Sequence, residues 1–174
     1  MINWKEFNWP EIFGTIYAVA PLMIQNQFRF LAADIQETAT AKYSNGQLKY
    51  IGNEANGKDF IGSDGYNYES KMKKRLIQKR TPRTEPIILK NFRGECLGFP
   101  EQTFDYMMAF DYTLNTVLLA PWDECNRDYK ISDSKIDIRL DTRKCEVIAE
   151  NVIPVKKNPV DIMQKYNDFV ASCG

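Results

Sequence analysis

Residues Lys58–Thr84 read KDFIGSDGYNYESKMKKRLIQKRTPRT, a stretch that joins a β-hairpin pattern to a run of basic residues. The loop Ser63-Asp64-Gly65 ends in Gly, which suits a type I turn closed by a left-handed residue. Strands paired around this loop would place Asp59 opposite Glu69. Directly opposed residues lie about 5 Å apart on one sheet face, and strand alternation adds Lys71 to that face. The pattern therefore predicts two carboxylates and an ammonium group at one place.

Such a cluster is suited to metal-assisted hydrolysis. Two carboxylates about 5 Å apart repel each other unless a cation lies between them, and hard oxygen ligands suit Mg²⁺. The ion would polarise a phosphate and help ionise water, while Lys71 would stabilise the nucleophile or the developing negative charge. Residues 71–83 contain seven Lys or Arg and no acid, which indicates a polyanionic substrate.

Three alternatives stay open from the residues alone. Two further acid-x-Lys triplets occur later in the chain, so this one could belong to an exposed hairpin with a cross-strand patch of charges. A two-residue Asp64-Gly65 turn would place Phe60, rather than Asp59, opposite Glu69. Asp64 could also replace Asp59 as a ligand, although a residue at the tip of a turn points away from the strand face.

The order of these residues resembles the PD-(D/E)xK nucleases, specifically the PvuII-like type II restriction endonucleases. Gly57-Lys58-Asp59 precedes a short turn and Tyr68-Glu69-Ser70-Lys71, with ten positions from the aspartate to the glutamate. Glu85–Lys90 is similar to the family's next strand, and Tyr106–Tyr112 and Thr116–Pro121 to the two after it. The resemblance covers roughly residues 55–125. An extra loop at residues 93–103 and both terminal thirds of the chain lie outside the family pattern.

The resemblance implies a magnesium-dependent nuclease. In that family the positions of Asp59 and Glu69 hold Mg²⁺ together with the carbonyl of Ser70, and the position of Lys71 is the catalytic lysine. The family also acts as a homodimer on double-stranded DNA, dimerising through its N-terminal region. Its recognition loop reads bases with histidines, and this chain has no histidine, so its recognition sequence should differ.

The basic loop after the hairpin is the predicted DNA-binding segment. Arginine, lysine, glutamine and threonine side chains suit the edges of bases in the major groove, and Pro82 would stiffen the loop. The resemblance assigns base contacts to Arg80, Thr81 and Arg83, and we assign Lys73 and Lys74 to phosphates. A solvated loop without a binding role is the alternative. The full predicted set is Lys73, Lys74, Gln78, Lys79, Arg80, Thr81, Arg83 and Thr84.

Composition excludes several other functions. With 23 basic and 23 acidic residues the chain has no net charge, so a nucleic-acid site must be a local patch. The absence of His excludes HNH nucleases, Ser-His-Asp hydrolases and most catalytic zinc sites. Four widely spaced cysteines without a C-x-x-C pair indicate free thiols in a reducing compartment, hence a cytoplasmic protein. We expect no membrane association, because the apolar run Ile12–Ile24 is too short to span a bilayer, and no organic cofactor.

The pattern along the chain predicts one α+β domain over residues 1–174. Residues 1–40 are expected to be helical, with Asn8 as a helix cap and an apolar excess that serves either the core or a dimer interface. Residues 41–155 should form the catalytic and DNA-binding sheet, with hairpins around Asn45-Gly46 and around Asp141–Lys144. Residues 156–174 should form a C-terminal helix. The resemblance makes this a PD-(D/E)xK restriction-endonuclease-like fold, with a mixed, mainly antiparallel central sheet flanked by helices.

These observations together favour a type II restriction endonuclease that cuts double-stranded DNA at a short palindrome. One alternative is a repair or phage nuclease that acts as a monomer on structured DNA. The other is a non-catalytic DNA-binding module that uses the basic loop alone. Only the two enzymes require Glu69, Lys71 and a divalent metal together.

Overall fold

The computed structural model of the chain describes residues 1–24, 29–52, 57–72, 87–93, 102–111, 115–125, 129–132 and 135–152. Its α-helices are α1 (Trp9–Ile24), α2 (Arg29–Lys42) and the short α3 (Trp122–Cys125), and its 3-10 helices are η1 (Trp4–Glu6) and η4 (Thr142–Lys144). Its strands are β1 (Leu48–Tyr50), β2 (Phe60–Gly62), β3 (Asn67–Met72), β4 (Ile87–Arg93), β5 (Tyr106–Asp111), β6 (Thr116–Pro121), β7 (Tyr129–Ser132), β8 (Lys135–Leu140) and β9 (Glu146–Glu150). The predicted C-terminal helix lies outside the described residues.

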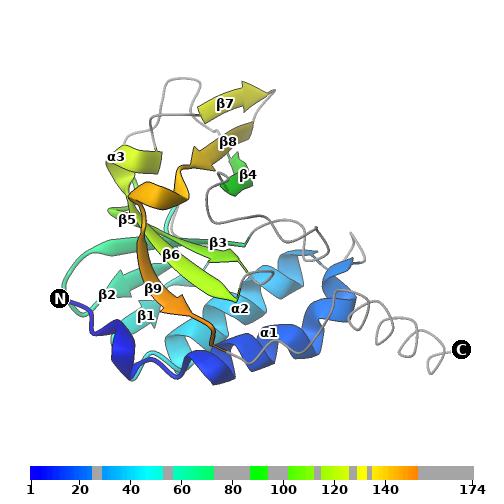
Figure 1. The fold of residues 1–174 in the computed structure, drawn as a ribbon, viewed down its shortest axis with the longest axis vertical. Coiled ribbons are helices and arrows are strands. Elements are labelled where there is room, and N and C mark those ends of the chain that lie inside the picture. The colour runs from blue at the N-terminus through cyan, green and yellow to red at the C-terminus, as the bar shows by residue number, and fades with distance from the viewer. Residues whose placement is uncertain are drawn as a thin grey trace, which may run out of the picture.

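The described strands form two sheets, shown in Figure 1. The larger one has six strands in the order β1-β2-β3-β5-β6-β9, and the smaller one has three in the order β4-β8-β7. In the larger sheet β3 runs parallel to β5, and the other neighbouring strands are antiparallel. A mixed sheet with a few helices confirms the predicted α+β class. The separate three-stranded sheet was not expected from the sequence.

Two predicted hairpins are wrong, although each turn is in the right place. Asn45 and Gly46 have positive φ angles of 55° and 75°, as the turn chemistry predicts, but the residues before them end α2 rather than form a strand. Around η4, β8 pairs with β4 and β7, whereas β9 pairs with β6. A turn signal fixes where the chain reverses, and burial of each strand against the rest of the fold decides its partner.

Strand β5 lies in the middle of the hydrophobic core. Met108 and Phe110 are fully buried in one cluster, and Met107 and Ala109 are fully buried in another on the opposite face of the strand. Burial on both faces explains why this strand is apolar at nearly every position rather than at alternate ones.

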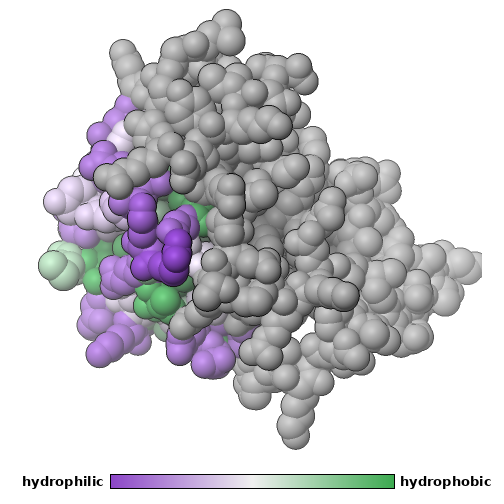
Figure 2. Space-filling model, turned by 45° about the horizontal axis from the view of Figure 1, so that its top comes forward, coloured by the Kyte–Doolittle hydropathy of each residue, from purple (hydrophilic) through white to green (hydrophobic). Residues whose placement is uncertain are grey.

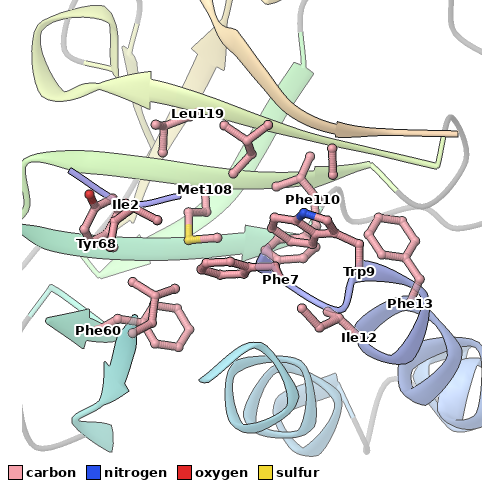
Figure 3. Packing of buried hydrophobic residues seen from close by; sticks show 14 residues of the cluster. Ile2, Phe7, Trp9, Ile12, Phe13, Phe60, Tyr68, Met108, Phe110 and Leu119 are labelled. Atoms are coloured by element: carbon pink, nitrogen blue, oxygen red, sulfur yellow. The ribbon is translucent and has the colours of Figure 1, made fainter. Parts of the chain in front are cut away.

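The N-terminal segment covers the first of these faces with aromatic side chains, as Figure 3 shows. Phe7 stacks on Trp9, with ring centroids 5.0 Å apart, and Trp9 and Phe13 both contact Phe110. The cap predicted at Asn8 is confirmed, since its side-chain oxygen accepts a hydrogen bond from the N–H of Glu11 at 3.4 Å. The start of α1 therefore packs into the hydrophobic core. Most side chains in the rest of α1 lie outside the described set, and a dimer interface there stays a prediction.

The second face is covered by α3 and by the end of β8. Leu140 is fully buried there beside Phe104 and Cys125, and Phe104 packs edge-on against Trp122 at 4.9 Å between centroids. Leu140 therefore attaches the three-stranded sheet to the six-stranded one. The described cysteines, Cys125 and Cys145, are free thiols. In the described part of the chain, no helix combines the length and the apolar character that crossing a bilayer requires.

Two glycines should respond in opposite ways to alanine. At Gly62 an added Cβ would lie 2.5 Å from the Oδ1 of Asp64 and 2.7 Å from the ring of Tyr68, so Gly62→Ala should destabilise the chain by about 1–3 kcal/mol. At Gly14, within α1, nothing lies within 4 Å of the added Cβ, and Gly14→Ala should stabilise by about 0.5–1 kcal/mol. Urea unfolding of both variants measures this. Equal effects would contradict the packing described at the hairpin.

Candidate active site

The hairpin between β2 and β3 has the predicted register. Phe60 pairs with Tyr68 and Ile61 with Asn67, and the N–H of Gly62 donates to the carbonyl of Tyr66 at 2.8 Å. The loop is the three-residue one, and its last residue, Gly65, has a φ of 84°. The two-residue turn, which would have placed Phe60 opposite Glu69, is therefore not formed.

Asp59 lies just beyond the pair of Phe60 with Tyr68 and is fixed there by three hydrogen bonds. Its N–H donates to the carbonyl of Tyr68 at 2.9 Å, and its carbonyl accepts from the N–H of Ile51 at 3.0 Å. Its side-chain Oδ2 accepts from the N–H of Ser70 at 2.7 Å. The carboxylate thus takes the place that a backbone carbonyl would occupy in a continued ladder, and lies directly beside β3.

Glu69 and Lys71 occur on β3 on either side of this contact. Because side chains alternate along a strand, both lie on the face opposite to that of Tyr68. The Nζ of Lys71 forms an ion pair with the Oε1 of Glu69, and the glutamate side chain is only 6% exposed while that of the lysine is 25% exposed. The structure therefore brings Asp59, Glu69 and Lys71 together, as the hairpin pattern predicts.

Helix α2 adds two buried polar residues that the sequence did not identify. Gln36 is 1% exposed, and its Nε2 donates to the Oγ of Ser70. Glu37 is 6% exposed and accepts a hydrogen bond from the hydroxyl of Tyr50, which raises the pKa of that phenol, already raised by burial, to about 12. In the sequence, Gln36 and Glu37 are marked only by their helical spacing beside Ile35 and Ala39. That pattern does not distinguish a functional site from an ordinary solvated helix face.

The carboxylates repel one another in the buried site. Burial raises the pKa of Asp59 to about 8, with further contributions from the charges of Glu69 and Glu37, and Lys71 opposes the rise. Burial likewise raises the pKa of Glu37 to about 7, against the same lysine charge. Burial alone would lower the pKa of Lys71, but the neighbouring carboxylates raise it above its ordinary value, so the ammonium stays charged. The cluster holds three carboxyl groups beside one ammonium group, so a bound cation would favour their ionised forms.

The raised pKa values of Asp59 and Glu37 predict that the chain becomes less stable as pH rises. Asp59 and Glu37 have folded pKa values of about 8 and 7, above their ordinary 3.8 and 4.5. Between these values the folded chain holds more protons than the unfolded chain, so the free energy of unfolding falls between about pH 4 and pH 8. Urea unfolding at several pH values should show this decline, and Asp59→Asn should flatten it. An unchanged slope in Asp59→Asn would contradict the raised pKa.

The donor atoms of the cluster fit a magnesium ion. In the described ranges no group of three or more His, Cys, Asp and Glu side chains is arranged to hold a metal. Mg²⁺, however, is usually bound by one or two carboxylates, completed by waters and substrate phosphates. Asp59 and Glu69 provide two such carboxylates, and Ser70, whose N–H contacts Asp59, directly follows Glu69 and has a backbone carbonyl as a further oxygen donor. Carboxylate and carbonyl oxygens are the ligand types that hard cations prefer.

The remaining predicted site residues are placed as follows. Asp64, the alternative ligand, is engaged in the hairpin loop, where its carboxylate accepts from the N–H of Tyr66 and from the hydroxyl of Tyr68 at 3.3 and 3.1 Å. The predicted DNA-binding residues fall outside the described residues, so their positions stay predictions: Lys73, Lys74, Gln78, Lys79, Arg80, Thr81, Arg83 and Thr84.

Comparison with known proteins returned no match, either to a protein-family model or to a curated protein.

Proposed function

We propose that the chain is a Mg²⁺-dependent deoxyribonuclease with a PD-(D/E)xK fold that acts as a homodimeric type II restriction endonuclease. The observation that carries the proposal is the convergence of Asp59, Glu69 and Lys71 around the backbone of Ser70. Burial, and next the charge of Glu69, raise the pKa of Asp59. Two such carboxyl groups beside a lysine that retains its charge suit hydrolysis of a phosphodiester. The order of the same residues along the chain supports the family assignment.

Each residue would have a distinct role at the scissile phosphate. Asp59 and Glu69, with the carbonyl of Ser70, would hold Mg²⁺, which when bound polarises the phosphate and lowers the pKa of water. Lys71, one-quarter exposed at the side chain, would donate to the attacking water or to the charge that develops on the phosphate. Glu37 would add a carboxylate that increases the negative charge of the site and receives a proton near neutral pH.

Sequence recognition and dimerisation complete the proposal. The segment between β3 and β4 begins after Met72, one residue beyond Lys71, and we propose that its Arg80, Thr81 and Arg83 read base edges close to the cleaved bond. A palindromic site mirrors a two-fold protein, and each subunit would cut one strand. The cytoplasmic location predicted from the cysteines belongs to the same proposal.

The proposal predicts site-specific cutting that requires a divalent metal. Supercoiled plasmid and bacteriophage DNA incubated with the chain and Mg²⁺ should give discrete fragments, and EDTA should abolish them. Sequencing the fragment ends would then give the recognition site and the stagger. Full activity in EDTA would contradict the metal-dependent assignment.

The alternatives give different results in the same assay. A repair or phage nuclease would cut branched or damaged substrates in preference to intact plasmid, and would sediment as a 20.2 kDa monomer rather than at twice that mass. A DNA-binding module would shift the mobility of DNA without cutting it under any metal condition.

A further inference from the structure

Ser70 lies between Glu69 and Lys71 on β3, but its side chain points to the other face of the sheet. Its N–H donates to the Oδ2 of Asp59 at 2.7 Å, so its backbone is part of the candidate site. Because side chains alternate along a strand, its hydroxyl lies on the face opposite to Glu69 and Lys71. The residue is only 3% exposed. The hydroxyl is therefore placed to act on the site through the backbone of β3 rather than on a substrate.

Gln36 of α2 holds this hydroxyl inside the protein. Its Nε2 donates to the Oγ of Ser70, and the whole residue is 1% exposed. Hydrophilic residues ordinarily lie at the surface, and they make up most of the described surface in the view of Figure 2. Burying an amide and a hydroxyl costs free energy unless they are hydrogen-bonded, and two apolar side chains would fill the same space without that cost. What the polar pair adds is direction, because a hydrogen bond requires a defined distance and angle whereas apolar contact does not.

Helix α2 is bonded to strands on both sides of Asp59. Glu37, the residue after Gln36, accepts a hydrogen bond from Tyr50 of β1, so consecutive residues of α2 are bonded to β1 and to β3. These two strands flank β2 in the sheet, and Asp59 directly precedes β2. The backbone of Asp59 is itself hydrogen-bonded to β3 and to the residue that follows β1. The two bonds from α2 therefore help to fix the strands between which Asp59 lies.

We propose that Gln36 is a positioning residue of the candidate active site. By holding the hydroxyl of Ser70 it fixes the segment Glu69-Ser70-Lys71, and with it the hydrogen bond from the N–H of Ser70 to Asp59. The carboxylates of Asp59 and Glu69 then keep a fixed separation, and Lys71 keeps its place beside them. The inference rests on the proposed function for the chemistry that this positioning serves.

The test compares two variants that each break the bond between α2 and β3. Gln36→Met keeps the length of the side chain without its amide, and Ser70→Ala removes the hydroxyl but leaves the backbone donor to Asp59. Partners that orient metal ligands typically change metal affinity or activity by about 10–100-fold when they are substituted. Each variant should weaken the binding of Mg²⁺ alone, measured by calorimetry, by a factor in this range. Single-turnover cleavage at a fixed Mg²⁺ concentration should slow similarly, while KM for DNA stays unchanged. The double variant should lose little more than either single one, because both substitutions remove the same interaction.

Thr40→Val is the matched control. Thr40 is fully buried on the same helix, about one turn after Gln36, and its Oγ1 donates to the carbonyl of Gln36 at 2.7 Å. The substitution removes a buried hydroxyl from α2 and leaves the bond to Ser70 in place. It should therefore keep the Mg²⁺ affinity and the cleavage rate of the unmodified chain. Urea unfolding of every variant separates these effects from changes in stability.

Hydrogen exchange of the Ser70 amide, measured by NMR, depends on neither metal nor DNA. The N–H of Ser70 is bonded to Asp59, and the N–H of Gly62 in the same hairpin is bonded to the carbonyl of Tyr66 at 2.8 Å. In Gln36→Met the amide of Ser70 should exchange several-fold faster, while that of Gly62 changes little, because the lost bond acts locally on Ser70.

Equal acceleration of both amides, or the same loss of Mg²⁺ affinity in Thr40→Val, would show a general loosening of the fold and would overturn the inference. In a chain that binds Mg²⁺ and cuts DNA, unchanged affinity and rate in Gln36→Met would overturn it as well. An unmodified chain that neither binds Mg²⁺ nor cuts DNA would refute the nuclease. The exchange of the Ser70 amide would then decide by itself whether Gln36 holds Ser70 against Asp59.

Discussion

Lys71→Ala should lower the rate of Mg²⁺-dependent DNA cleavage by about 10²–10³-fold, the usual cost of removing a preorganised donor to a developing charge. Glu69→Gln should cost at least as much, because it removes the proposed metal ligand and the ion-pair partner of Lys71 together. The Glu69 side chain is 6% exposed and that of Lys71 is 25% exposed, so their interactions are stronger than those of fully exposed charges. Single-turnover cleavage of a plasmid measures the chemical step.

DNA binding separates a catalytic defect from a folding defect. Ca²⁺ tolerates looser coordination than Mg²⁺ and should support DNA binding without turnover. Lys71→Ala should therefore bind duplex in Ca²⁺ nearly as well as the unmodified chain. Lys49→Ala, which changes an exposed lysine on the edge strand β1, is the matched control and should cut normally. Cutting by Glu69→Gln at the rate of the unmodified chain would contradict the assignment of the site.

Phe110→Ala should destabilise the chain by about 3–5 kcal/mol, the range for removing a fully buried aromatic side chain. Phe110 contacts Trp9 and Phe13 across the junction of β5 with the N-terminal segment, at 6.4 and 6.2 Å between ring centroids. The substitution would leave a cavity bounded by two other rings. Urea unfolding followed by circular dichroism measures the loss. Ile61→Ala, at a side chain 38% exposed, should cost far less, and equal losses would contradict the burial of Phe110.

Short-range sequence patterns predicted the hairpin of β2 and β3 better than they predicted the pairing of the other strands. The Gly at position 65 and the alternation around it fixed a register that the structure confirms. The pairing of β9 with β6, and of β8 with β4, joins segments distant in sequence, and no turn residue encodes such a choice. The sequence pattern therefore identified most of the strands, but neither β7 nor the three-stranded sheet to which it belongs.

The residues of the candidate site also differ in how well the sequence predicted them. Asp59, Glu69 and Lys71 lie within one hairpin, so spacing and alternation along the chain were enough to group them. Glu37 belongs to the same cluster but lies on α2, and it joins the cluster only because α2 packs against β1 and β3 in the folded chain. A buried glutamate on a helix has no local pattern of its own, since its partners come from other elements.

The parallel pairing of β3 with β5 also bears on how specificity can change over time. Parallel neighbours cannot be joined by a tight turn, so the chain leaves β3 after Met72 and rejoins the six-stranded sheet only at Tyr106. The proposed reading loop and β4 both lie in that excursion. Doubling the length of a flexible connection costs only about 0.6 kcal/mol in closure entropy. Under the proposed function, the part that reads DNA can therefore be lengthened, shortened or exchanged while the part that cuts it stays in register.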